Sequence, residues 1–192
     1  MRVLNVHERV IAAPLAAVGA LLDSLASDHD ALWPVSSWPR MRFDRPLGIG
    51  ASGGHGPIGY AVEQYHPASM IRFRFLGPRG FDGHHRFEAL AMSENSTLLR
   101  HTIDMSIGGP ALFTWPVAIR ALHDALVEDA LAQAQASLGL APAVSPWSAW
   151  VKVLRWLMSG GRAGPQRAPT PVSPESADRP GGPVPSPWQR TS

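Results

Sequence analysis

Cysteine is absent from this chain of 192 residues, and lysine occurs once, at position 152. Without cysteine, the chain can form no disulfide, use no thiolate nucleophile and bind no metal through a thiolate. Runs of 18 consecutive apolar residues are also missing, so the sequence predicts no membrane-spanning helix. Any chemistry at a site must therefore come from other groups, among which the 8 histidines stand out.

Charge and composition divide the chain into three predicted parts. Residues 1–140 carry 11 arginines and 13 acidic residues, a net charge of −2, whereas residues 141–192 carry 6 basic and 2 acidic residues, a net charge of +4. A domain with the net negative charge of residues 1–140 lacks the basic surface that nucleic-acid binding requires, so we expect no nucleic-acid partner. Residues 1–140 are predicted to form the folded domain and residues 141–159 an amphipathic, Trp-rich helix. From residue 160 the proline- and glycine-rich sequence predicts disorder.

The apolar run at residues 10–22 follows Arg2 and Arg9 and could be taken for a secretory signal. Glu8 lies beside the run and Pro14 interrupts it, which favours a strand ending near residue 12 and a helix starting at Pro14. We therefore expect a cytoplasmic protein.

Residues 48–53 read Gly-Ile-Gly-Ala-Ser-Gly, a literal match to the G-x-G-x-x-G dinucleotide-binding fingerprint. That fingerprint works only where a helix begins within it, and here further glycines and Pro57 follow at once. The next segment, residues 58–65, alternates like a strand, and no acidic residue stands about 20 positions further on. The match predicts no nucleotide site. We expect a mobile hairpin loop at residues 48–56, and no cofactor.

Alternating patterns predict strands at residues 3–11, 58–65, 70–76, 84–91 and 98–107, with a final helix at 116–138. A turn at residues 93–96 would pair Phe87 with Ile103 and Ala89 with His101. The loop before it would pair Phe73 with Phe87, and the turn at 66–69 would place Glu63 opposite Arg72. All three turns give an antiparallel sheet with one apolar and one charged face, which needs a cover. The final helix can supply the cover through Trp115, Ile119, Leu122, Leu126 and Ala130. Arg120, Asp124 and Glu128 follow another face, where they fit a solvated ladder as well as a second polar group for the site.

This arrangement resembles the SRPBCC superfamily, also called START-like or polyketide-cyclase-like. The resemblance covers residues 3–139 and is carried by "ERVIAAPLAAVGALL", "GGHGPIGYAVEQYHP", "FRFLGPRGFDGHHRFE" and "WPVAIRALHDALVEDAL". It implies an α+β helix-grip fold, in which a curved antiparallel sheet wraps around a long C-terminal helix with a hydrophobic cavity between them. Because the superfamily includes carriers, cyclases, receptors and co-chaperones, the fold does not decide the function.

The predicted register names the residues that would line such a cavity and bind a ligand. They are Tyr60, Phe73, Phe75, His85, Phe87, His101, Ile103, Met105, Trp115, Ile119 and Leu122. His101 is the candidate catalytic base, because an imidazole in an apolar pocket stays neutral and can accept a proton. The same register puts His85 about 13 Å from His101, at about 3.4 Å per residue, too far to share a metal or a proton. The remaining histidines show no metal-ligand spacing, so we expect no metal; His123 is expected at the cavity rim.

The sequence is compatible with three functions. A carrier or sensor of a small hydrophobic ligand needs only the cavity. A polyketide cyclase- or dehydratase-like enzyme also needs a polar group that acts on its substrate, here His101. A co-chaperone-type interaction module needs neither, because its interior can be filled.

The segment "SPWSAWVKVLRWLMSG", residues 145–160, predicts a helix with a broad apolar face. That face carries Trp147, Trp150, Val151, Leu154, Leu157 and Met158. Such a face must be covered, and two partners are open for residues 146–159: a peripheral membrane contact, or protein in the form of its own domain or a second copy.

Overall fold

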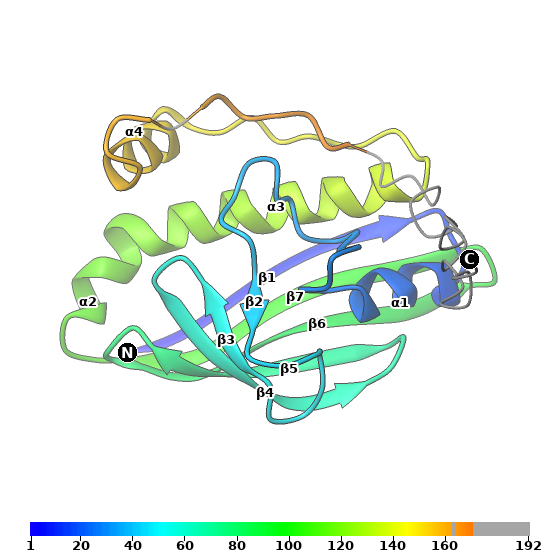
Figure 1. Ribbon diagram of the computed structural model, residues 1–192, viewed down its shortest axis with the longest axis horizontal. Coiled ribbons are helices and arrows are strands. Elements are labelled where there is room, and N and C mark those ends of the chain that lie inside the picture. The colour runs from blue at the N-terminus through cyan, green and yellow to red at the C-terminus, as the bar shows by residue number, and fades with distance from the viewer. Residues whose placement is uncertain (163, 171–192) are drawn as a thin grey trace, which may run out of the picture.

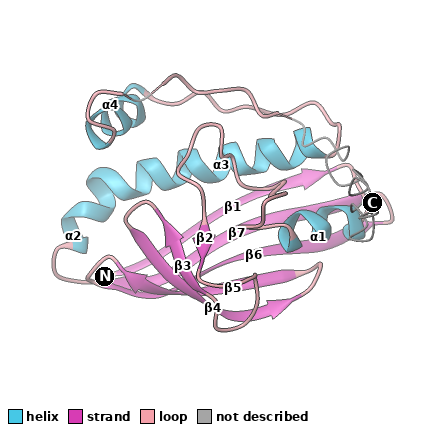
Figure 2. Cartoon of the chain, in the orientation of Figure 1, coloured by secondary structure: helices cyan, strands magenta, loops and turns pink. Residues whose placement is uncertain are grey.

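A sheet of seven strands curves around one long helix in the computed structural model, which describes residues 1–162 and 164–170 (Figures 1 and 2). In chain order the strands are β1 (Arg2–Ile11), β2 (Arg42–Phe43), β3 (Ser52–His55), β4 (Ile58–His66), β5 (Met70–Gly77), β6 (Phe81–Ser93) and β7 (Ser96–Ile107). Their order across the sheet is β1-β7-β6-β5-β4-β3-β2, and every pair is antiparallel. The predicted α+β helix-grip architecture is confirmed. Strands β2 and β3 were not predicted.

The helices lie on one face of the sheet. They are α1 (Leu15–Asp23), α2 (Ala111–Thr114), the π-helix η1 (Trp115–Ile119), α3 (Arg120–Ser137) and α4 (Ala149–Met158). Figure 1 shows α3 running across the sheet and α4 lying on the other side of α3. The helix predicted at 116–138 thus comprises η1 and α3, and α2 precedes them directly. Pro116, which has no N–H to donate, lies in η1, where the chain takes the wider π form. Among the described residues, no helix is both long and apolar enough to cross a membrane.

The predicted face of each strand is correct, but two strand registers are displaced by two residues. Phe87 pairs with His101 instead of Ile103, and Phe73 pairs with His85 instead of Phe87. In the first case a two-residue turn pairs Ser93 with Ser96, and a bulge at Met92 then shifts the ladder. A shift of two residues keeps every side chain on its face, because the side-chain period of a strand is two.

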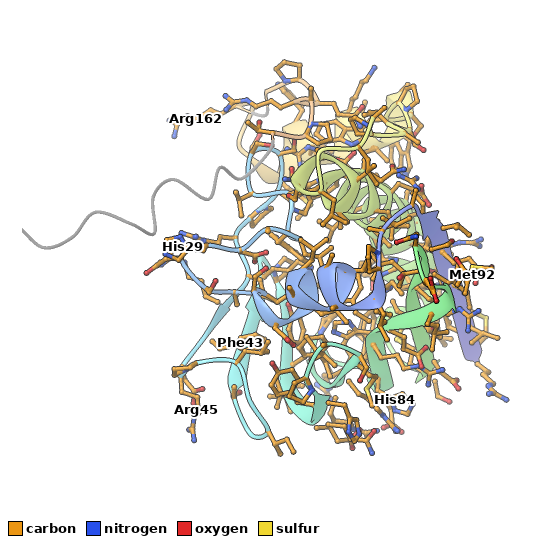
Figure 3. The ribbon with its side chains drawn as sticks, turned by 90° about the vertical axis from the view of Figure 1, so that its right-hand side faces the viewer. His29, Phe43, Arg45, His84, Met92 and Arg162 are labelled. Carbon is orange, nitrogen blue, oxygen red and sulfur yellow. The ribbon has the colours of Figure 1, made fainter. Side chains whose placement is uncertain are left out.

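Between β4 and β5 the predicted register holds for Tyr60 with Phe75 and for Val62 with Phe73. A bulge at Glu63 then moves the remaining pairs by one residue. Even so, the Glu63 carboxylate lies 2.9 Å from Nε of Arg72, the predicted neighbour. The outer face of the sheet is charged as expected, and Figure 3 shows His84 projecting from it.

The glycine-rich segment is part of the sheet. No helix begins there, as predicted, but residues 52–55 form β3 and not a loop, pairing with β4 on one side and β2 on the other. A Cβ atom placed on Gly53 would lie 1.9 Å from the carbonyl oxygen of Arg42. Glycine is required at this position because a neighbouring backbone occupies the side-chain space, which explains the fingerprint match without a nucleotide.

Replacing Gly53 with alanine should therefore destabilise the fold by about 1–3 kcal/mol, since the β2 backbone would have to move. Gly48→Ala is the matched control, because its Cβ would have no neighbour nearer than 3.9 Å and should change stability by less than about 0.5 kcal/mol. Chemical denaturation of both variants measures the difference. Equal stabilities, or calorimetric binding of NAD that Gly53→Ala abolishes, would contradict this account.

Candidate functional site

A narrow cavity of about 40 Å³ lies between the concave face of the sheet and the η1–α3 segment. Its lining comprises Trp33, His55, Ile58, Phe75, Phe81, His85, Phe87, His101, Ile103, Trp115, Ile119, His123, Leu126, Val127 and Ala130. Aromatic rings occupy most of the space between helix and sheet, so the remaining volume suits one small group or a water molecule. We call this space the inner cavity.

A larger cleft of about 360 Å³ shares His55, Ile119, His123 and Leu126 with the inner cavity. Its other lining residues are Trp38, Pro39, Gly56, Leu122, Arg155, Met158 and Ser159. They come from the α1–β2 connection, the β3–β4 turn, α3 and α4. The inner cavity and this outer cleft are therefore two parts of one site, and α4 forms a wall of the outer part.

Two histidines meet on the sheet side of the inner cavity. The Nδ1 atom of His85 lies 3.2 Å from Nε2 of His101, and both residues are buried, with exposed fractions of 5% and 3%. The predicted separation of about 13 Å is therefore wrong, because the turn that pairs Ser93 with Ser96 and the bulge at Met92 each shift the register by one residue and bring His101 opposite Phe87, diagonally beside His85. The two imidazoles can share one hydrogen bond.

His123 extends this group from the helix side. Its ring centroid lies 5.0 Å from that of His101. Three buried imidazole nitrogens have no polar partner among the described residues, namely Nε2 of His85, Nδ1 of His101 and Nε2 of His123, whereas Nδ1 of His123 lies 3.5 Å from an Asp124 carboxylate oxygen. A buried polar atom without a partner costs about 1–3 kcal/mol, so these nitrogens favour a bound molecule that can pair with them.

Burial also sets the protonation of these histidines. Desolvation lowers the pKa of His85 and of His101 well below the ordinary value, and repulsion from neighbouring histidines, when these are protonated, acts in the same direction. The pKa of His123 is lowered by burial despite the nearby Asp124 carboxylate. Desolvation likewise lowers the pKa of His55, which bonds to the Tyr60 hydroxyl at 2.9 Å, to about 3. At neutral pH the site therefore presents neutral imidazoles, each with one donor and one acceptor nitrogen.

A charged network lies behind His123, between α3 and β1. The His7 ring contacts Glu128 at 2.8 Å through Nδ1 and Asp124 at 3.1 Å through Nε2. These hydrogen bonds, that to Asp124 above all, raise the pKa of His7 although its burial opposes them. Arg9 adds an ion pair to Glu128 at 2.7 Å. Of the possible solvated ladder, the Arg120–Asp124 pair is present at 3.7 Å, but Asp124 and Glu128 also bind His7 and thereby attach α3 to β1.

The same network contains the group of residues best placed to hold a metal ion in the described part of the chain. One ligand atom each from His7, His123 and Asp124 lies within 4.8 Å of the others. Sequence spacing could not reveal this group, because β1 and α3 are far apart along the chain. Hydrogen bonds to two carboxylates already satisfy both nitrogens of His7, so the arrangement is explained without a metal.

Helix α4 is fixed to the body by a buried carboxylate. Asp129 on α3 accepts hydrogen bonds from the indole nitrogens of Trp38, at 2.7 Å, and Trp147, at 2.9 Å. The guanidinium of Arg155 lies 4.3 Å from the centroid of each of these two indoles. Gln166 contributes a third hydrogen bond to Asp129, at 2.7 Å. The inward side of α4 thus docks on its own domain, one of the two predicted kinds of partner.

Most of the predicted ligand-binding residues line the site. Phe75, His85, Phe87, His101, Ile103, Trp115 and Ile119 line the inner cavity, and Leu122 lines the outer cleft. Tyr60, Phe73 and Met105 are buried in the core outside both linings. Sequence reasoning missed Trp33, Trp38, His55, Phe81 and Arg155. His55 follows the misread glycines, and the tryptophans lie in a connection without periodicity, so no pattern marked them.

The predicted disorder of residues 160–192 falls mainly on residue 163 and residues 171–192, which lie outside the described residues. Within the described part of that segment, residues 164–170 form neither helix nor strand. The Gln166 side chain nevertheless contacts α3 and the carbonyl oxygen of Ser145.

A curved sheet that holds a long helix over an inward-facing cavity defines the helix-grip fold, the α+β fold of SRPBCC-type proteins. Solved structures share it at low sequence identity. A protein from Thermobifida fusca aligns with a TM-score of 0.56 at 15% identity, covering 74% of this chain and 99% of its own. A norcoclaurine synthase from Thalictrum flavum, in complex with dopamine and hydroxybenzaldehyde, aligns with a TM-score of 0.56 at 12% identity, covering 72% and 88%.

A conserved protein of unknown function from Enterococcus faecalis also aligns, with a TM-score of 0.52 at 13% identity, covering 84% of this chain and 87% of its own. No protein-family model and no curated protein matches the sequence. At these identities the likeness establishes the fold and leaves the activity to be argued from the site.

The buried histidines should make the protein sensitive to acid. When folding lowers the pKa of a histidine, the free energy of unfolding is unaffected above the unfolded pKa of about 6.5. It decreases as the pH falls from there toward the folded pKa. His7, whose pKa is raised, acts in the opposite sense, because its contribution is present below pH 6.5 and lost as the pH rises. We expect the free energy of unfolding to fall between pH 6.5 and 5, because the buried histidines whose pKa is lowered outnumber His7, whose pKa is raised.

His101→Leu should reduce that slope by about 1.4 kcal/mol per pH unit, the value for one excluded proton. His29→Leu, at an exposed position, is the control and should leave the slope unchanged. Urea denaturation between pH 7 and 5 provides the measurement. Equal slopes for the wild type and His101→Leu would mean that His101 is not held neutral by burial.

Proposed function

We propose that this protein binds a small, largely apolar molecule that carries one hydrogen-bonding group, as a carrier or sensor. The observation that supports this most directly is that His85, His101 and His123, which line an otherwise apolar inner cavity, each keep an imidazole nitrogen without a polar partner among the described residues. An apolar wall provides affinity through burial, and a few fixed polar groups select orientation and chemistry.

The two volumes indicate how such a ligand would sit. At about 360 Å³ the outer cleft is within the usual range for small-molecule sites, whereas the inner cavity of about 40 Å³ admits only a substituent. The body of the ligand would occupy the cleft beneath α4, and its hydroxyl or carbonyl group would enter the cavity beside His85, His101 and His123. The complex of norcoclaurine synthase with dopamine and hydroxybenzaldehyde supports this class of ligand, since both are small aromatic molecules with polar groups.

A pair of related probes tests the proposal. The protein should bind 2-naphthol about tenfold more tightly than naphthalene, because only 2-naphthol can pair with the imidazoles. In His101→Leu this preference should largely disappear, while naphthalene binding remains. Competition against a fluorescent hydrophobic probe measures both affinities.

Ile119→Trp adds a steric test, because Ile119 lies where cleft and cavity meet, and a larger ring there should block both probes. Leu76→Trp is the control, since Leu76 is exposed on β5. The proposal is wrong if neither probe binds the wild type, or if both bind Ile119→Trp as well as they bind Leu76→Trp. Failure of both probes to bind the wild type would indicate a filled interior and would favour the interaction module.

One observation favours a cyclase- or dehydratase-like enzyme as the second candidate. His85 and His101 form a neutral, hydrogen-bonded pair, in which His101 can accept a proton and share its charge with His85. Native mass spectrometry of the protein purified from its own host would identify a bound molecule. A carrier would return that molecule unchanged on incubation, whereas an enzyme would convert it, and His101→Leu would then reduce turnover more than affinity.

A partner for the outward side of α4 completes the proposal. Since the inward side is occupied by this chain's own Asp129 and Trp38, the outward side remains for a peripheral membrane contact or for self-association through residues 146–159.

A further inference from the structure

Large apolar side chains gather on the outward side of α4 and on the neighbouring α2–η1 segment. The most exposed are Trp150 (46%), Trp156 (55%) and Leu157 (58%) on α4, with Phe113 (75%) and Val117 (57%) beside them. The Trp150 indole donates a hydrogen bond to the Val117 carbonyl at 2.7 Å, so the two segments form one continuous surface. We call it the α4 face. A soluble monomer rarely exposes a contiguous apolar surface of this kind.

The α4 face is distinct from the side of α4 that packs on the domain. Trp147, Val151 and Leu154 already bury the opposite side of α4, and Asp129 fixes Trp147. The helix is therefore apolar on two sides, one used for the core and one presented outward.

The charge around the α4 face identifies its partner. Residues 141–170 contain no acidic residue, and their exposed basic residues are Lys152, Arg162 and Arg167, whereas Arg155 lies inward over Trp38 and Trp147. Lys152 is exposed, and Figure 3 shows Arg162 projecting into solvent from the same layer. A two-fold dimer through this face would bring the basic residues of both copies together without an acidic partner. An anionic lipid surface instead neutralises them and accepts tryptophan and leucine at the depth of its headgroups.

We propose that the α4 face docks on an anionic membrane surface and places the mouth of the outer cleft against the lipid. The geometry fits, because Met158, which follows Leu157 at the end of α4 and is 60% exposed, lines the outer cleft next to Ser159, so the cleft opens beside the α4 face. A helix of 10 residues is about 15 Å long, so α4 lies along the interface and does not span the bilayer. This inference rests in part on the proposed function: an apolar ligand dissolved in the membrane would enter the site directly.

Vesicle flotation with the full-length chain tests the inference. The protein should float with vesicles of phosphatidylcholine and phosphatidylglycerol at 3:1, and should bind at least about tenfold more weakly to phosphatidylcholine alone or in raised salt. The double substitution Trp156→Ser and Leu157→Ser should reduce binding to the anionic vesicles by at least about tenfold. The matched control is Leu76→Ser with Met92→Ser, two residues equally exposed on the sheet, and it should float like the wild type.

Several outcomes would overturn the inference. The wild type could stay unbound, or the control pair could lose as much binding as the α4 pair. Analytical ultracentrifugation could also show a dimer that the Trp156→Ser and Leu157→Ser substitutions dissociate, in which case a second copy covers the α4 face. Finally, a chain ending at residue 170 could float when the full-length chain does not, which would assign the face to residues 171–192.

Binding of 2-naphthol in solution separates this inference from the proposed function. The Trp156→Ser and Leu157→Ser variant leaves the imidazoles intact and should bind 2-naphthol as the wild type does. Loss of flotation with retained 2-naphthol binding therefore confirms that the α4 face acts separately from the cavity. Flotation by a wild type that binds no 2-naphthol would retain the membrane contact and reject the ligand site.

Discussion

The buried carboxylate of Asp129 is the interaction on which the shape of the site depends. A polar group inside a protein is tolerated only when hydrogen bonds replace those it made to water, and Asp129 receives them from Trp38, Trp147 and Gln166. These donors belong to three segments that are distant in the sequence. One carboxylate on α3 thus holds together the α1–β2 connection, α4 and the chain that follows α4, and these segments contribute much of the wall of the outer cleft.

The interior of the site follows from a second constraint, the limited space between α3 and the sheet. Rings from β5, β6 and η1 fill most of that space, so the inner cavity has a volume of only about 40 Å³. Within it, burial keeps the imidazoles of His85 and His101 neutral, and the β1–α3 network holds the charged groups on the far side of His123. The polar part of the site is therefore small, uncharged and well defined in position, which suits recognition of a single hydroxyl or carbonyl group.

Much of the fold was predictable, because strand alternation and helical spacing are local properties of the sequence. The inward orientation of His85, Phe87 and His101 followed from alternation alone, and a register error of two residues left it unchanged. The distance between His85 and His101 depended instead on a bulge at Met92, for which the sequence carries no signal. The glycine-rich strand β3 was likewise hidden, since its residues are selected by the space left by β2 and not by side-chain pattern.

The parts of the site that sequence reasoning missed depend on contacts between distant segments. Trp38, Asp129 and Trp147 are unremarkable one by one, and only the fold brings them together. Asp124 and Glu128 had the spacing of an exposed ladder, yet their partner His7 lies on β1, more than a hundred residues away. Long-range electrostatic pairs of this kind leave no periodic trace in a single sequence.

The central claim is that neutral imidazoles in the inner cavity receive the polar group of a ligand. Nitrogen-15 NMR of the histidine side chains at pH 7, recorded before and after addition of 2-naphthol, tests it most directly. We expect neutral rings for His85, His101 and His123, and nitrogen shifts in at least one of them on binding, while the exposed His29 is unaffected. Protonated rings in the free protein, or nitrogen shifts confined to histidines outside the cavity, would contradict it.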